Sequence, residues 1–208
     1  DILCLGNEDT YKFCEDVLSE LIDIFPSEVI HIGGDEAPTV RVEHCPKCQA
    51  LMQREHLTPK NIQGYFTNRI EKFVNSKGRR IMGWDEIMDG DINTSAMVHC
   101  WRNPSFGIKA AQKGHDVVLS PTKYCYFDFY QANPRAVHEP LAIGGYLPVD
   151  SVYKMDTMPK DISPENRKHI IGIQANLWTE YVAVPNHAEY MLLPRMAALA
   201  ENAWVKDR

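Results

Sequence analysis

Apolar residues recur at helical spacing in four stretches of the chain. Each stretch places them three or four positions apart, which is the pattern of a helix with one buried face. Helix-ending and helix-starting residues support the pattern, because Pro26 follows the first stretch and Pro59 suits the first turn of the second. The predicted helices cover residues 11–25, the stretch from Thr58 to a stop at Gly78, residues 105–113 and residues 186–204.

Five short runs rich in β-branched and other apolar residues alternate with these helices. Alternation of this kind predicts an α/β fold with a parallel sheet and right-handed crossovers. It fits an open doubly wound sheet and also part of a (β/α)₈ barrel, which needs eight strands and about 250 residues. The segment 121–168 has weak periodicity, which is typical of a functional loop. The predicted strands are residues 29–34, 80–84, 96–101, 116–120 and 169–175.

Composition narrows the class of protein. The 208 residues are 44% hydrophobic and 24% charged, as in ordinary globular proteins. The net charge of −6 comes without a cluster of Lys or Arg, so we expect no nucleic-acid partner. No apolar run approaches the roughly 20 residues that a membrane-spanning helix needs, and the first residues do not resemble a signal peptide.

The spacing of Cys45 and Cys48 is that of half a zinc site or of a redox pair. A four-ligand site needs a second close pair, which the sequence lacks, and His44 is the one obvious further donor nearby. We place the pair in a connecting loop rather than at a helix start in a thioredoxin-like unit. The pattern therefore favours structural thiols or a local disulfide over a metal or redox site.

Polar and aromatic residues collect at the carboxyl ends of the five predicted strands. Ligands of α/β proteins bind where the carboxyl ends of the strands converge, so this placement predicts a binding site. Carboxylates can hold hydroxyl groups while indole rings stack on apolar C–H faces, a combination that suits a sugar. The residues in question are Asp35 and Glu36, Trp84 to Glu86, Trp101, Tyr126 to Asp128, and Trp178 to Glu180.

Asp35 and Glu36 are adjacent carboxylates that come directly after two glycines. The glycines allow a sharp turn and a close approach of the backbone to a ligand. Repulsion between neighbouring carboxylates separates their pKa values, so that one can hold a proton while the other stays ionised. Glycoside hydrolysis needs such an acid and such an anion. The alternative is an acidic helix cap after a glycine turn.

Together these segments resemble the family-20 glycoside hydrolases, the β-N-acetylhexosaminidases. The matching runs span most of the chain in family order, and they correspond to about strands 4–8 of the family's (β/α)₈ barrel. The resemblance implies that residues 1–208 are a fragment of a single catalytic domain, without the early strands and the domain that usually precedes them. The runs are His31 to Glu36, Gly83 to Glu86, Trp101, Tyr126 to Asp128, and Trp178 with Glu180.

The resemblance also implies a retaining exo-hydrolase of terminal β-linked N-acetylglucosamine or N-acetylgalactosamine that uses substrate-assisted catalysis. Glu36 would be the acid and base, Asp35 would orient the acetamido group, and Tyr126 would hydrogen-bond its oxygen. An arginine and a histidine from the early strands are missing, so we expect this chain alone to be nearly inactive. The implied sugar-binding residues are Trp84, Trp101, Trp178, Asp128 and Glu180.

Other interpretations compete at individual positions. His31 and His99 are expected to be interior or supporting histidines rather than catalysts, and Asp85 and Glu86 are left out of the catalytic set. A carbohydrate-binding module without turnover is the alternative function, although such a module has no need of the Asp–Glu pair. A family-18 chitinase would require a spaced run of acidic residues along one strand, which this sequence lacks. The resemblance suggests a periplasmic, secreted or lysosomal protein.

Overall fold

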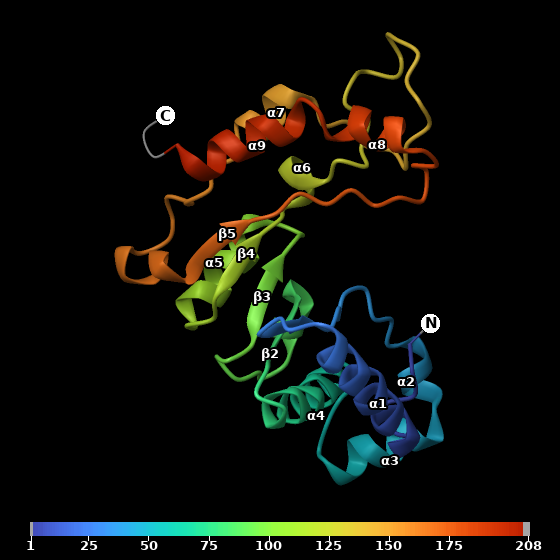
Figure 1. Cartoon of the computed structure of the whole chain (residues 1–208). Coiled ribbons are helices and arrows are strands. Elements are labelled where there is room, and N and C mark those ends of the chain that lie inside the picture. Colours follow the sequence, from blue (N-terminus) through green and yellow to red (C-terminus); the bar gives the residue numbers. More distant parts are fainter. Residues whose placement is uncertain (1, 206–208) are drawn as a thin grey trace. The chain divides into compact units, whose positions relative to one another are not determined.

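The computed structural model describes residues 2–205, which form two compact units. The first unit comprises the chain up to His99 together with Lys113–Asp116. The second comprises Cys100–Gln112 and the chain from Val117 onward. Strands and helices alternate through both units (Figure 1), so the expected α/β class is confirmed.

Three parallel strands follow one another along the chain, namely β1 (Val29–His31), β2 (Arg80–Trp84) and β3 (Met97–Cys100), and all of their residues except Cys100 belong to the first unit. Val29 pairs with Arg80 and Met82 pairs with Met97, so the strands lie side by side in chain order. The side chains of β3 are buried throughout, as the continuous apolar run predicts for a strand covered on both faces.

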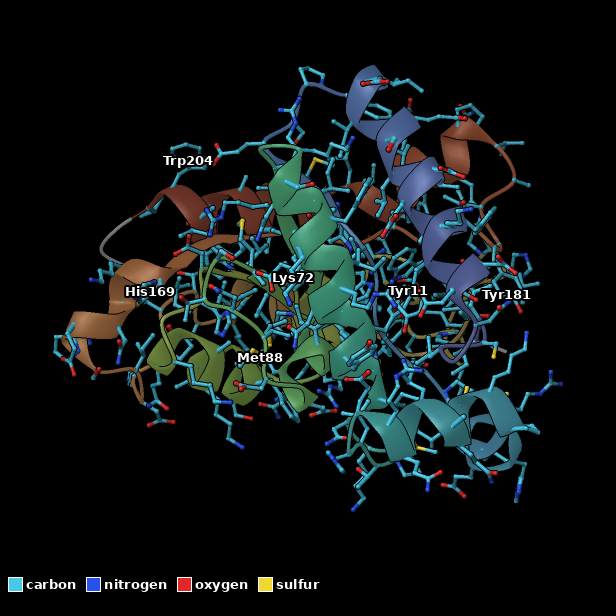
Figure 2. All side chains as sticks on the ribbon, turned by 90° about the horizontal axis from the view of Figure 1, so that it is seen from below. Tyr11, Lys72, Met88, His169, Tyr181 and Trp204 are labelled. Carbon is cyan, nitrogen blue, oxygen red and sulfur yellow. The ribbon has the colours of Figure 1, made fainter. Side chains whose placement is uncertain are left out.

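Two helices of the first unit, α1 (Glu8–Ile24) and α4 (Ile62–Ser76), pack against each other (Figure 1). Tyr11 lies between them (Figure 2), with its ring centroid 5.4 Å from that of Phe66 and the Arg69 guanidinium 3.7 Å above it. The Tyr11 hydroxyl donates a 2.8 Å hydrogen bond to the carbonyl of Leu5. This bond ties the segment before α1 to the body of the unit.

The structure corrects two predictions in this unit, the start of a helix and the nature of a loop. Helix α4 begins at Ile62 rather than at Thr58, because Thr58 and Asn61 close a turn of their own: the Thr58 N–H donates to Asn61 Oδ1 at 2.6 Å. The segment that we expected to be a connecting loop also contains α2 (Val40–His44) and α3 (Pro46–Arg54), with Cys45 at the cap of α3.

The second unit contains the parallel pair β4 (Val117–Leu119) and β5 (Ile170–Ile173). The helix α5 (Pro104–Gln112) packs on β4, and α7 (Val149–Tyr153) lies beside α9 (Arg195–Trp204) (Figure 1). The loop expected over residues 121–168 is largely irregular and carries only short helices. The remaining elements are α6 (Thr122–Cys125), the 3₁₀ helices η1 (Asp85–Asp89, in the first unit) and η2 (Pro164–His169), and α8 (Pro185–Leu192).

The single helix predicted over residues 186–204 is wrong, because the structure has α8 and α9 with a break at Leu193 and Pro194. Leu193 is extended, with φ −99° and ψ 138°. Steric conflict with the proline ring disfavours helical geometry in the preceding residue, and proline has no N–H for the helical ladder. Among the described residues, no helix is both long enough and apolar enough to cross a membrane.

Candidate active site

The chain turns sharply directly after β1. Gly33 and Gly34 have φ values of +71° and +99°, a region that residues with a Cβ rarely adopt. Glu36 has φ +47°, one of two non-glycine residues with positive φ among those described. A non-glycine residue in this region carries a strain of about 1–3 kcal/mol, and such residues cluster at functional sites.

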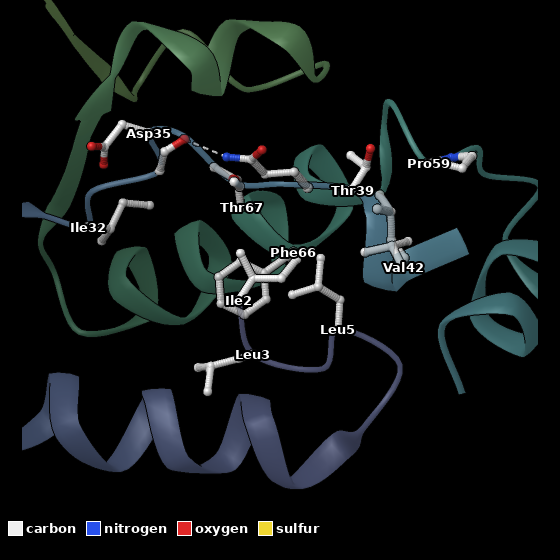
Figure 3. Close-up of a pocket in the computed structure, with 14 residues that line it drawn as sticks. Ile2, Leu3, Leu5, Ile32, Asp35, Thr39, Val42, Pro59, Phe66 and Thr67 are labelled. Atoms are coloured by element: carbon white, nitrogen blue, oxygen red, sulfur yellow. Dashed lines mark hydrogen bonds between the residues drawn. The ribbon is translucent and has the colours of Figure 1, made fainter. Parts of the chain in front are cut away.

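The turn is held against β2 and α4. The Trp84 N–H donates to the Gly33 carbonyl at 2.9 Å, and the Gln63 side chain donates to the Gly34 carbonyl at 2.5 Å, the dashed line in Figure 3. A Cβ at Gly34 would lie 2.8 Å from Cγ2 of Ile87, so no larger residue fits there without a shift. The backbone before Asp35 is therefore fixed on two sides.

Asp35 and Glu36 are exposed. Asp35 stands at the edge of a cavity of about 220 Å³ (Figure 3). Most of the cavity wall is apolar, with Leu5, Val42 and Phe66 among its residues. The cavity itself therefore offers few partners for sugar hydroxyls, whereas the two carboxylates are open to a ligand.

Trp84, the last residue of β2, belongs to an aromatic cluster with His31 and His99. Its indole stacks on the His99 imidazole, and the His31 Nε2 and His99 Nδ1 atoms lie 3.3 Å apart. Burial, reinforced by the charge of His31, lowers the pKa of His99 to about 4. Desolvation beside the other two rings also lowers the pKa of His31, although that residue is exposed to solvent. At neutral pH both rings are uncharged and act as supports for the indole. Asp85, directly after Trp84, is fully buried.

In the second unit, Tyr126 lies at the centre of a group of predicted aromatic residues. Its ring centroid is 6.2 Å from that of Trp101, in a stacked orientation, and 6.3 Å from that of Trp178, in an edge orientation. Phe129 adds a tilted ring at 6.0 Å, which the sequence analysis did not single out. Trp178 is 41% exposed, so its surface is available for stacking.

The backbone of Tyr126 is held beside the chain that leaves β5. Tyr126 forms an isolated parallel bridge with Asn176, whose side chain donates to the Ser120 hydroxyl at 2.8 Å. Burial raises the pKa of Tyr126 to about 12, with hydrogen bonds donated by the Asn176 and Trp178 side chains acting in the opposite direction. The phenol therefore stays protonated at neutral pH and can donate a hydrogen bond.

Asp128 is only 4% exposed, and its Oδ1 atom has no hydrogen-bond partner among the described residues. A buried carboxylate oxygen without a donor is costly, and it marks a position where a ligand hydroxyl can bind. Burial raises the pKa of Asp128 to about 6; the charge of the exposed Glu180 raises it further, while that of Arg195 lowers it.

Arg195 is a further residue of this region, and no motif in the sequence points to it. Its side chain is fully buried and donates to the carbonyls of Phe127 at 2.6 Å, Phe129 at 2.9 Å and Leu147 at 3.1 Å, as well as to that of Met191. The first two carbonyls flank Asp128. Arg195 therefore fixes the backbone that carries Asp128, and nothing in the local sequence around Arg195 indicates this role.

The predicted residues divide between the two units. Each of them lies at or beyond the carboxyl end of a strand, with Trp84 closing β2, Trp101 directly after β3, and Tyr126 beyond β4 and α6. The first unit contains Asp35, Glu36 and Trp84, and the second contains Trp101, Tyr126, Asp128, Trp178 and Glu180.

Known proteins match nearly the whole chain. A β-hexosaminidase of Porphyromonas gingivalis is 39% identical over 206 residues, which is 98% of this chain and 26% of the relative. A β-hexosaminidase of Vibrio furnissii is 37% identical over 92% of this chain and 32% of the relative. The chain thus spans about a quarter to a third of the length of these relatives.

Solved structures also match nearly the whole chain. The GH20 exo-β-N-acetylglucosaminidase of Vibrio harveyi in complex with N-acetylglucosamine has a TM-score of 0.88 at 31% identity, covering 100% of this chain and 33% of that one. The chitobiase of Flavobacterium johnsoniae has a TM-score of 0.81 at 33% identity, covering 97% of this chain and 30% of that one. The model of the glycosyl hydrolase family 20 catalytic domain matches residues 1–207, and this chain therefore belongs to that family.

Proposed function

We propose that the protein containing this chain is a retaining exo-β-N-acetylhexosaminidase that removes terminal β-linked N-acetylglucosamine or N-acetylgalactosamine from glycans. Family membership supports the hydrolase class. The N-acetylglucosamine bound in the Vibrio harveyi relative supports the substrate class. The carboxylates and indoles beyond the strand ends are the side chains that such a substrate requires.

In the first step, the protonated carboxyl group of Glu36 transfers its proton to the glycosidic oxygen as the bond between that oxygen and the anomeric carbon breaks. The substrate's own acetamido oxygen forms a bond to the anomeric carbon, giving an oxazolinium ion and releasing the aglycone. Asp35 accepts a hydrogen bond from the acetamido N–H and offsets the developing positive charge. The Tyr126 hydroxyl donates to the acetamido oxygen and orients it.

In the second step, the Glu36 carboxylate takes a proton from a water molecule. The water oxygen bonds to the anomeric carbon, and the bond from that carbon to the acetamido oxygen breaks. Two inversions at the same carbon give net retention of configuration. Glu36 regains its proton and is ready for the next cycle, so no metal or organic cofactor takes part in this scheme.

The remaining predicted residues bind the sugar. Trp84, Trp101 and Trp178 would wall the pocket around the acetamido methyl group and the ring. Asp128 and Glu180 would accept hydrogen bonds from hydroxyl groups of a terminal sugar, which accounts for exo action. The buried and unpartnered Oδ1 atom of Asp128 supports this role.

The observation that carries the proposal is the backbone strain at Glu36. A glutamate with φ +47° follows two glycines that also have positive φ, and the carboxylates of Asp35 and Glu36 are exposed at the end of β1. An ordinary acidic helix cap does not need this conformation, since a cap residue has extended backbone geometry.

The test is kinetic and uses the full-length polypeptide that carries this chain. Glu36→Gln should lower kcat by about a thousandfold on glycans, whose leaving groups need protonation, and by much less on an aryl glycoside with an acidic phenol. Asp35→Asn should be severe with both substrates, because both need the acetamido group. Glu43→Gln on α2, also exposed, is the control and should keep wild-type rates. Wild-type kinetics in both active-site variants would refute the assignment.

A further inference from the structure

Three cysteines of the first unit come together although one is distant in sequence from the other two. The Sγ atom of Cys4 lies 3.5 Å from that of Cys45 and 3.8 Å from that of Cys48. All three sulfur atoms lie within 4.8 Å of one another, and they form the one group of at least three potential metal ligands found among the described residues. All three cysteines are free thiols. The sequence pattern revealed only two of them as a pair.

The spacing of the sulfur atoms matches a metal site better than a disulfide. A disulfide requires an S–S distance of about 2.05 Å and joins only two cysteines. Zinc binds thiolates at about 2.3 Å in tetrahedral geometry, which places neighbouring sulfur atoms about 3.8 Å apart. The two distances from Cys4 are 3.5 and 3.8 Å, so a zinc ion fits with little movement.

Two of the three thiols lie at the start of α3. Cys45 is the N-cap residue of this helix and Cys48 is in its first turn, and the Cys45 side chain makes no capping hydrogen bond. The positive end of the helix dipole favours the thiolate, which is the form of cysteine that binds zinc.

Cys4 is held in place by a turn that suits only a glycine at its centre. The Asn7 N–H and the Thr10 hydroxyl both donate to the Cys4 carbonyl, at 3.1 and 2.8 Å. A Cβ at Gly6 would lie 2.2 Å from the carbonyl carbon of Lys47, so this backbone packs directly on the start of α3. In Figure 1 the start of α1 lies next to α3. The turn thus brings Cys4 to the other two cysteines before any metal binds.

We propose that Cys4, Cys45 and Cys48 form a thiolate site for one zinc ion that fastens the segment before α1 to the start of α3. A fourth ligand from solvent completes the tetrahedron, because Cys4 and Cys45 are only partly buried. The bound metal would cross-link two segments that are 41 residues apart in sequence and would keep one solvent position, unlike the closed four-ligand sites of most structural zinc proteins. Its function is independent of the glycosidase chemistry proposed above.

The first experiment measures metal binding by the full-length polypeptide, purified with a phosphine reductant and then freed of metal. Titration with Co²⁺ should give one equivalent bound, with thiolate-to-cobalt charge-transfer bands and the ligand-field bands of a tetrahedral site. Zn²⁺ should displace the cobalt and remove both sets of bands. Absence of charge-transfer bands at saturating Co²⁺ overturns the proposal.

The second experiment identifies the ligands. Cys4→Ser, Cys45→Ser and Cys48→Ser should each weaken Zn²⁺ binding by at least about tenfold, as loss of a ligand to a structural metal does. Cys14→Ser is the matched control, because Cys14 is a free and partly buried cysteine on α1 outside the cluster. It should leave Zn²⁺ binding unchanged. Equal affinities in all four variants overturn the proposal.

A third measurement does not depend on the folding of any variant. Wild-type protein is alkylated with iodoacetamide with and without Zn²⁺, and the modified cysteines are located by mass spectrometry. Zinc should slow the modification of Cys4 and Cys45 at least tenfold without affecting Cys14. Equal rates with and without Zn²⁺ would contradict the proposal, as would a stable disulfide within the cluster in reductant-treated protein.

Discussion

The indole of Trp84 stacks on the imidazole of His99, with ring centroids 4.3 Å apart and an angle of 20° between the planes. His31 approaches the same indole from the side, at 4.9 Å and 65°. The three rings link the ends of β1, β2 and β3 within the first unit. The indole of Trp84, which is only 9% exposed, thus rests against two histidines.

This packing predicts a loss of stability in mild acid. Burial, together with the charge of His31, lowers the pKa of His99 from 6.5 to about 4. The unfolded chain therefore binds more protons than the folded one in this interval, and the stability falls as the pH decreases from about 6.5 to 4. His31 acts in the same direction, although the charge of Asp35 opposes the shift of its pKa.

We expect His99→Gln to reduce this pH dependence. Urea unfolding at pH 7 and pH 5 measures the free energy of unfolding of the wild type, of His99→Gln and of His44→Gln. His44 is exposed on α2 and serves as the control. The interpretation is wrong if the wild type and His99→Gln lose the same free energy between the two pH values.

The raised pKa of Asp128 predicts that substrate binding weakens in mild acid, because here the side chain that binds the substrate is a carboxylate that must stay ionised. Burial and the charge of Glu180 raise the pKa of Asp128 to about 6, against the charge of Arg195. As the pH falls through 6 the carboxylate takes up a proton and loses acceptor capacity for a sugar hydroxyl, so KM should rise. Asp128→Asn should raise KM about ten- to a hundredfold at pH 7, as for a hydrogen bond to a charged group.

The pH profile separates this role from a structural one. Asp128→Asn should flatten the rise in KM between pH 7 and pH 5, because an amide does not titrate there. The control is Asp150→Asn, which removes an exposed carboxylate from α7 of the same unit. A variant that keeps the wild-type pH profile would count against Asp128 as a hydroxyl acceptor.

We expect Gly34→Ala to lower activity, whereas the matched variant Gly78→Ala should not. Gly34 and Gly78 both have positive φ, but a Cβ at Gly34 meets Ile87 at 2.8 Å, whereas a Cβ at Gly78 meets nothing within 4 Å. Both alanine variants should lose about 1–2 kcal/mol of stability from left-handed strain. Only Gly34→Ala should also displace Asp35 and lower kcat, by at least about tenfold.

Steady-state kinetics and thermal melting of the two variants, side by side, check this expectation. Gly78→Ala reports the cost of backbone strain alone. If both variants keep the wild-type kcat, the close contact between residue 34 and Ile87 plays no part in placing Asp35.

Replacing Arg195 should have a large effect on stability, because its buried guanidinium donates hydrogen bonds to several backbone carbonyls. Arg195→Met leaves the carbonyls of Phe127, Phe129 and Leu147 without the donors that they have in the wild type. Each buried carbonyl without a donor costs about 1–3 kcal/mol, so the total loss should exceed about 3 kcal/mol. The exposed Arg167→Met in η2 is the control, with an expected change below about 0.5 kcal/mol.

Arg195→Lys distinguishes hydrogen bonding from charge. A lysine keeps the positive charge but cannot reproduce the planar fork of donors, so it should recover little of the lost stability. Urea unfolding curves of the three variants provide the comparison. Full recovery by lysine would show that the charge of residue 195, rather than its hydrogen bonds, stabilises the loop.

The chain in isolation should turn over substrate poorly. Apolar residues of α1 such as Phe13 and Ile24 are 58% and 67% exposed, and the solved relatives are about three times as long as the chain. Further polypeptide is expected to cover such a surface and to complete the sugar site. Residues 1–208 should show less than about 1% of the full-length rate on a chromogenic N-acetylglucosaminide, and comparable turnover would contradict this expectation.

The alternation of strands and helices could be predicted from the sequence, because it depends on the local period of apolar residues. The predicted helix boundaries were wrong where a local contact overrode the period of apolar residues. The turn closed by Asn61 moves the start of α4 to Ile62, and Pro194 divides the last helix. The resemblance to the family could also be recognised from the sequence, because the family's motifs are short contiguous runs of residues. The roles assigned to Asp35, Glu36 and Tyr126 stay predictions until the kinetic tests are done.

Contacts between residues distant in sequence are visible only in the folded chain. Cys4 joins Cys45 and Cys48, Arg195 supports the loop of Asp128, and His31 meets His99. No local period encodes such pairs, because the chain brings them together only when its strands pair and its helices pack. The family and the carboxylate pair at Asp35 and Glu36 can therefore be read from contiguous motifs, whereas the side chains that hold this pair and its neighbours in place are set by the folded backbone.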